Sequence, residues 1–203
     1  MFSLLYYGYE FLSGFVPFLA VLYLFWRRSK PKITAAYIIW PIILAVYVLC
    51  VFHVTGAGTV YDALDYRFRG LADRVNLIPF SREINPFGYI LNVFMFMPFG
   101  FLVPLIWKKA SRLGSVALAG LLFSLLIELS QLLCWRGTDV DDLIMNTLGA
   151  CIGFLVYRIW VLCANDRFQQ DRNIAELPCF VLAIYFGRCF LYNGLGLIQL
   201  WYG

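Results

Sequence analysis

Long apolar runs separated by short polar stretches are the main feature of this 203-residue sequence. Six runs approach or exceed the ~20 residues that an α-helix needs to cross a bilayer. The expected membrane helices span, in order, about Leu4–Trp26, Ile33–His53, Gly88–Trp107, Val116–Cys134, Asp139–Cys163 and Cys179–Trp201. The pattern predicts an all-α integral membrane protein, a polytopic helix bundle of about six transmembrane helices.

Two longer polar segments interrupt this pattern, about Thr55–Asn85 and about Ala164–Glu176. Charged residues make up 14% of the chain and hydrophobic residues 62%, with a mean hydropathy of +0.77. Soluble domains carry about 25% charged residues, so the composition leaves no room for a separate soluble domain. The first apolar run lacks a preceding basic residue and a following small-residue cleavage site, so we expect no cleavable signal peptide.

The basic residues predict the orientation in the membrane. The net charge of +4 does not indicate nucleic-acid binding, because these residues flank the predicted helices. The first, third and fifth loops carry an excess of them: Arg27, Arg28, Lys30, Lys32, Lys108, Lys109, Arg112, Arg167 and Arg172. The positive-inside rule places these loops in the cytoplasm. We therefore expect both chain termini outside, on the same side as the Thr55–Asn85 loop.

The six cysteines do not predict a disulfide framework. Most lie inside apolar runs, and no Cys-x-x-Cys spacing occurs. We interpret them as small apolar packing residues.

Polar residues recur at helical spacing on two neighbouring predicted helices. The fourth helix carries Gly120, Ser124, Glu128 and Gln131, and the fifth carries Asp139, Asp142, Asn146, Gly149 and Gly153. Each set lies on one helix face. Arg136 lies in the turn between them, and Asn92 lies near the outer end of the third helix. Because an ionised carboxylate in hydrocarbon is costly, we expect these residues to line one acidic pocket that opens outward.

Structural roles compete with this interpretation. Asp141 points about 100° away from Asp142, and we assign it to capping of the fifth helix. Gly149 and Gly153 form a GxxxG pair that permits close helix packing. Asn92, Gln131 and Asn146 fit interhelical hydrogen bonding as well as ligand binding, and the sequence leaves both open.

Arg188 lies near the middle of the last apolar run. It requires a partner such as Glu10 or Glu128, or a break in the segment at Gly187–Arg188. His53, the only histidine, lies at a helix end and is interpreted as interfacial rather than catalytic.

The joint motifs resemble those of the VanZ-like family. They are Asn76-Leu-Ile-Pro-Phe80, Asn92, Phe96-Met-Pro-Phe-Gly100, Glu128-x-x-Gln131, Arg136, Asp139, Asp142, Asn146, Gly149 and Gly153. The resemblance covers about Ile33–Cys163. It implies a four-helix membrane domain over residues 33–163, with an additional N-terminal helix in residues 1–32 and a polar segment and final helix in residues 164–203.

The resemblance also implies a place in the bacterial cytoplasmic membrane and a role in resistance to lipid-tailed glycopeptides such as teicoplanin. It supplies no reaction. By matching position, the functional set is Asn76, Pro79, Asn92, Pro98, Glu128, Gln131, Arg136, Asp139, Asp142 and Asn146.

Three functions remain open at this point. The first is binding of a lipid-linked envelope precursor or a lipoglycopeptide, with Arg136 meeting phosphate. The second is an enzyme acting on a lipid head group. Glu128 would be its general base, Asp142 a further catalytic candidate, and Asp139 with Asp142 would hold Mg²⁺. The third is a small transporter or flippase. HExxH and GxSxG motifs are absent, which argues against zinc and serine hydrolase chemistry. Under all three functions, membrane lipids are also expected partners.

Overall fold

The computed structural model describes residues 2–29, 35–66, 74–81, 85–164 and 172–194, and α-helices dominate this part. The helices are α1 (Phe2–Ser29), α2 (Ala35–Val54), α3 (Val60–Tyr66), α5 (Pro86–Ile106), α6 (Leu113–Gln131), α7 (Val140–Ala164) and α8 (Glu176–Leu191). A 3-10 turn, η1 (Lys108–Ala110), joins α5 to α6. Two-residue strands β1 (Val75–Asn76) and β2 (Thr138–Asp139) pair in parallel. The prediction of an all-α bundle is confirmed.

In the part of the chain that the structure describes, five helices, α1, α2, α5, α6 and α7, are long and apolar enough to cross a membrane. Each exposes large aliphatic or aromatic side chains on its outer face, as lipid-facing helices do. The chain is thus a multi-pass membrane protein. Helix α8 has 16 residues and is about 24 Å long, shorter than the ~30 Å hydrocarbon core.

The bounds of α8 differ from the sequence prediction. The helix begins at Glu176 rather than Cys179, and it ends at Leu191, well before Trp201. The early start has a local cause, because Arg172 bonds the Glu176 carboxylate at 2.5 Å and an acid suits a helix N-terminus. Residues 195–203 of the predicted run lie outside the described part.

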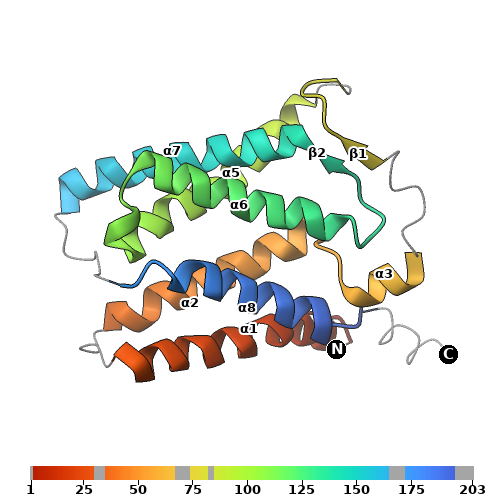
Figure 1. The fold of residues 1–203 in the computed structure, drawn as a ribbon, viewed down its shortest axis with the longest axis horizontal. Helices are drawn as coiled ribbons and strands as arrows, with labels where there is room; N and C mark the ends of the chain where they lie inside the picture. The colour runs from red at the N-terminus through yellow and green to blue at the C-terminus, as the bar shows by residue number, and fades with distance from the viewer. Residues whose placement is uncertain (1, 30–34, 67–73, 82–84, 165–171, 195–203) are drawn as a thin grey trace.

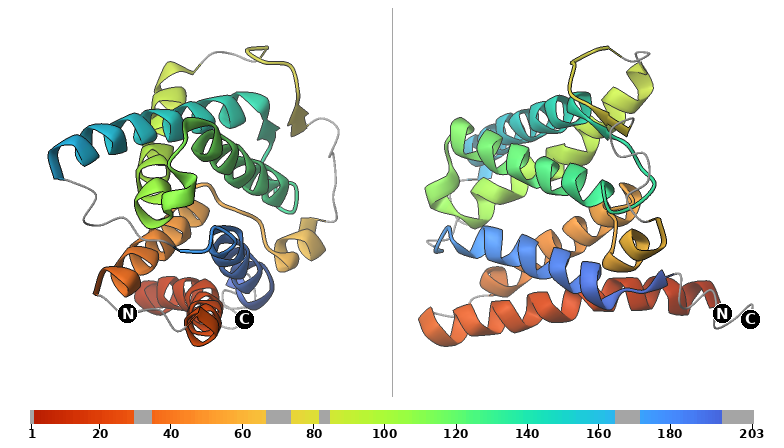
Figure 2. Two further views of the ribbon diagram at one scale, coloured as in Figure 1. Left: turned by 60° about the vertical axis from the view of Figure 1, so that its left-hand side comes forward. Right: turned by 45° about the vertical axis from the view of Figure 1, so that its right-hand side comes forward.

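The helices form two groups, α5–α6–α7 and α1–α2–α8, stacked on one another (Figures 1 and 2). Successive long helices run in opposite directions, so the start of α1 and the end of α8 lie at the same end of the bundle as α3 and the β1–β2 pair (Figure 1). That both termini lie outside the membrane on one side stays a prediction.

Helices α5 and α7 approach each other most closely. A Cβ added at Gly149 or Gly153 would lie 2.3 or 2.0 Å from a carbonyl oxygen of α5, and one at Gly100 would lie 1.9 Å from a carbonyl oxygen of α7. Only glycine tolerates such backbone contact. The prediction that Gly149 and Gly153 permit close packing is confirmed.

The cysteines are all free. Cys189 is buried, but Cys50, Cys163 and Cys179 are exposed on the outer surface of the bundle. The packing interpretation therefore holds for Cys189 and is wrong for these three.

Candidate functional site

A buried carboxylate near the end of α6 organises the turn that follows. Glu128 is 1% exposed, and its Oε2 accepts a hydrogen bond from the backbone N–H of Asp139 at 3.0 Å. The Thr138 hydroxyl donates to the Glu128 carbonyl oxygen at 3.0 Å. These bonds fold the chain after α6 back onto the helix and position the start of α7.

The β1–β2 pair brings the Asn76 motif to the same place, with Asn76 opposite Asp139. The Asn76 amide donates to both Asp139 carboxylate oxygens at 3.2 Å. Its own carbonyl oxygen accepts from the Ile78 N–H at 3.2 Å and from the Ser81 hydroxyl at 2.9 Å. Both faces of this amide are therefore used to hold residues 74–81 against the N-terminus of α7.

Asp139, rather than Asp141, caps α7. Asp139 Oδ1 accepts from the N–H of Asp141 at 3.0 Å, which is the geometry of an N-cap side chain. Asp141 is 2% exposed and accepts from the Phe80 N–H at 2.8 Å and the Tyr89 hydroxyl at 2.5 Å. The capping interpretation of Asp141 is therefore wrong, because its carboxylate tethers two other segments to α7.

The Asp141 contact also stabilises an unusual backbone. Phe80 has a φ of 55°, in the left-handed region that a bulky residue adopts only under constraint. Such conformations persist where the surrounding structure enforces them, often at functional sites. Here Asp141 supplies that constraint through the Phe80 N–H.

Two amide side chains connect α7 to its neighbours. Asn92 of α5 donates to Asp142 Oδ1 at 2.6 Å, and Asn146 donates to the Ser124 hydroxyl of α6 at 2.9 Å. The Asn146 carbonyl oxygen is buried and has no hydrogen-bond partner among the described residues. Both asparagines thus serve as interhelical links here.

Gln131 and Arg136 bond a single carbonyl oxygen at the end of α2. The Thr55 carbonyl accepts from Gln131 Nε2 at 3.0 Å and from Arg136 Nη1 at 2.8 Å. The next residue, Gly56, has a φ of 60°, and a Cβ added there would lie 3.0 Å from Arg136 Nε. A glycine at this position therefore lets the arginine lie against the backbone.

Eight of the ten positions in the functional set are polar candidates for ligand binding: Asn76, Asn92, Glu128, Gln131, Arg136, Asp139, Asp142 and Asn146. Hydrogen bonds connect these eight residues to neighbouring segments in several groups. Asp139 and Asp142 lie close enough to Glu128 to act on it electrostatically. Most of the candidates bond directly to one another or to backbone groups, while Arg136 borders a cavity of about 350 Å³. The expectation of one outward-opening pocket lined by the whole set is not confirmed.

Asp139 and Asp142, the residues expected to hold Mg²⁺, are not part of a larger set of metal ligands in the described structure. Among the described residues, no group of three or more His, Cys, Asp or Glu side chains is arranged to hold a metal ion. The Asp139 carboxylate accepts from Asn76 and a backbone N–H, and the Asp142 carboxylate accepts from Asn92. Both Asp139 oxygens and Asp142 Oδ1 thus already accept hydrogen bonds from N–H groups of the protein.

A second polar cluster joins α1, α2 and α8. Arg188 is 6% exposed, and its Nε and Nη2 donate to one Glu10 oxygen at 2.9 and 2.8 Å. The other Glu10 oxygen lies 2.8 Å from His53 Nδ1. Arg188 also donates to the Ala57 carbonyl. Glu10 is therefore the partner of Arg188, and α8 continues unbroken through Gly187–Arg188.

This second cluster borders the same cavity as Arg136. Glu10, His53 and Arg188 line it together with Cys134 and Arg136. Burial raises the pKa of the Cys134 thiol, in the turn after α6, which makes it a weak nucleophile. Glu10 and Arg188 were not among the candidate site residues, because both lie outside the region of the resemblance. Glu10 was one of the two partners expected for Arg188, and that expectation is confirmed.

The fold and these contacts define a polytopic α-helical membrane protein whose helices are connected by a buried polar network at one end of the bundle. Comparison with known sequences makes the assignment specific. The chain belongs to the VanZ/LLP1 family, whose model matches residues 38–161.

It is 33% identical over 123 residues to Protein VanZ of Enterococcus faecium, an alignment that covers 60% of this chain and 70% of that relative. No solved structure matches the chain significantly. The family range contains all eight candidate residues, whereas Glu10 and Arg188 lie outside it.

Proposed function

We propose that this protein is a bacterial envelope protein that contributes to resistance against teicoplanin and related lipoglycopeptides. It does so by binding a lipid-linked or glycopeptide ligand at the polar end of the bundle. The family membership supports the role in resistance. The observation that carries the binding site is the position of Arg136 beside a cavity of about 350 Å³.

Arg136 suits an anionic or phosphate-bearing ligand. Its guanidinium has five N–H donors, and Thr55 is the acceptor of one of them. Among the described residues, no carboxylate lies within ion-pair distance of it. A guanidinium with spare donors binds phosphate or carboxylate through paired, charge-assisted hydrogen bonds.

The network behind Arg136 gives the site its rigidity. Gln131 bonds the same Thr55 carbonyl, and Glu128 fixes the turn in which Arg136 lies. Catalysis has less support than binding, because the carboxylates are engaged with amide and backbone donors rather than directed at a cavity. The role of Glu128 and Asp142 is then to hold the binding surface in one conformation.

Expression in a susceptible Gram-positive host tests the proposal. Resistance should rise more for teicoplanin than for vancomycin, because a lipid-tailed drug concentrates at the outer leaflet where the site is proposed to open. Glu128→Gln, Asp142→Asn and Arg136→Gln should each abolish the increase at unchanged protein level. Leu118→Ala, at a lipid-facing position of α6 that is 57% exposed, is the matched control and should retain it. Full resistance in all three polar variants would overturn the proposal.

A further inference from the structure

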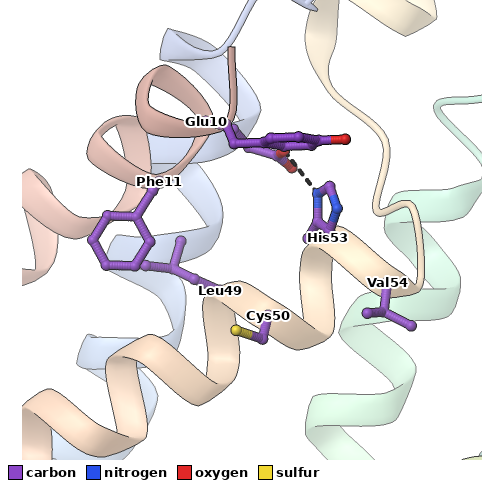
Figure 3. Close-up of a pocket in the computed structure, with 7 residues that line it drawn as sticks. Glu10, Phe11, Leu49, Cys50, His53 and Val54 are labelled. Carbon is purple, nitrogen blue, oxygen red and sulfur yellow. Dashed lines mark hydrogen bonds and ion pairs between the residues drawn. The ribbon is translucent and has the colours of Figure 1, made fainter. Parts of the chain in front are cut away.

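An apolar groove lies between α1 and α2 at the same end of the bundle. Its volume is about 370 Å³, and Glu10 and His53 lie where the two helices approach each other (Figure 3). The remaining wall is apolar or weakly polar and is formed by Tyr7, Phe11, Leu49, Cys50 and Val54. Tyr7, Cys50 and Val54 are exposed, so the groove is open on the membrane-facing side of the helices.

This groove adjoins the cavity of Arg136. Glu10 and His53 line both. An apolar compartment of about 370 Å³ and a polar compartment of about 350 Å³ therefore meet at one pair of side chains. A ligand that fills both must itself be amphiphilic.

Among the described residues, two basic side chains, Arg136 and Arg188, and two acidic ones, Glu10 and Asp62, line the polar compartment. Of the two basic side chains, Arg136 is the one that keeps donors for an anionic group. Arg188 is neutralised by Glu10, and the Asp62 carboxylate accepts the N–H and hydroxyl of Thr59 at 2.7 and 2.8 Å. Arg136 is not neutralised by any carboxylate among the described residues. The Arg136 guanidinium therefore keeps N–H donors for an anionic group at the wall of the cavity.

We infer that the groove and the cavity form one binding site for a phosphate-bearing lipid. The chain lies between α1 and α2, and the phosphate meets Arg136. This inference rests on the proposed function and names the chemical class of its ligand. Basic pockets at membrane interfaces bind anionic head groups in this way.

The site is completed by helices outside the family range. Glu10 comes from α1 and Arg188 from α8, whereas the family match covers residues 38–161. The Glu10–Arg188 pair closes the α1–α8 contact beside the cavity. The additional helix α1 therefore supplies one wall of the groove, and the family domain supplies the α2 wall and the phosphate contact.

Photo-crosslinking of the purified full-length protein tests the inference. The probe is hexadecyl phosphate with a diazirine near the chain end, and the matched probe is the corresponding hexadecyl alcohol. Label should concentrate on peptides of α1 and α2. Half-maximal labelling should need about tenfold less phosphate probe than alcohol probe. An affinity difference of about tenfold is what one charge-assisted hydrogen bond contributes. Arg136→Gln should abolish this preference.

Two exposed cysteines provide a matched pair of variants. Cys50→Trp fills the groove, whereas Cys163→Trp places the same indole on the exposed surface of α7. The first should reduce labelling of α1 and α2 several-fold, and the second should leave it unchanged. Uniform labelling of all lipid-facing helices, or equal labelling by both probes, would mean ordinary surrounding lipid only and would overturn the inference.

The outcomes separate this inference from the proposed function. Resistance that depends on Arg136 without specific labelling overturns the lipid site alone. Specific labelling in a protein that confers no resistance overturns the role in resistance alone.

Discussion

Replacement of Gly153 by alanine is expected to force α5 and α7 apart. The added Cβ would lie 2.0 Å from the Met97 carbonyl oxygen, where ordinary contacts begin at 3.4 Å. A backbone carbonyl cannot rotate away as a flexible side chain can, so one helix must recede by about 1.4 Å. Insertion of one extra carbon into a packed contact costs about 1–3 kcal/mol. The better helix propensity of alanine offsets about 1 kcal/mol of this cost at most.

The displacement should also reach the polar network. Asn92 donates to Asp142 between the same two helices at 2.6 Å. A separation of this size would stretch that distance to about 4 Å, beyond hydrogen-bond range. Gly153→Ala should therefore lower resistance as well as stability, although Gly153 lies away from the candidate site.

The assay is heating of detergent-purified protein followed by size-exclusion chromatography. The midpoint for loss of the monodisperse peak should fall by about 2–8 °C. Gly114→Ala on α6 is the control, since a Cβ there meets nothing within 4 Å and the midpoint should stay or rise. Equal midpoints for the two variants would refute the backbone-contact argument.

Three further outcomes follow from other contacts. Asp141→Asn should abolish resistance as completely as Asp142→Asn, because Asp141 tethers the segment before α5. A capping residue would give a milder effect. A mild effect at equal protein level would therefore contradict the tether. Glu10→Gln should destabilise the protein by about 3–5 kcal/mol, because Arg188 keeps an uncompensated buried charge. In the heating assay, the double variant Glu10→Gln/Arg188→Met should recover part of the lost stability. If it recovers none, the loss in Glu10→Gln arises from packing rather than from the unpaired charge. Lys30→Cys in a cysteine-free background should resist an impermeant reagent added outside, and labelling there would reverse the proposed orientation.

The helix positions could be predicted because lipid imposes a simple length rule on apolar runs. For example, α5 ends at Ile106, one residue before the predicted end at Trp107. The length rule misplaced the start of α8, because the pairing of Arg172 with Glu176 extends this helix into a polar segment. Local contacts of this kind do not appear in a hydropathy pattern.

The candidate residues could be selected by spacing, but their partners could not. Asn92, Asp142 and Asn146 were expected on facing helices, and direct hydrogen bonds link them to neighbouring helices there. The role of Asp141 was missed because its partners, Phe80 and Tyr89, lie 61 and 52 residues away. Helical periodicity assigns a face to a residue and carries no information about a loop that packs over that face.

The bond between Glu10 and Arg188 has a consequence for synthesis of the protein. The two residues lie 178 positions apart, so at about 5–20 residues per second the ribosome needs roughly 10–40 s to make the second after the first. During that interval α1 carries an acidic residue whose arginine partner does not yet exist, and a carboxylate without its cationic partner resists transfer into hydrocarbon. Stable insertion of α1 is therefore expected only after α8 has been made. A chain truncated before α8 should contain an incompletely inserted α1 and should be degraded by membrane quality-control proteases.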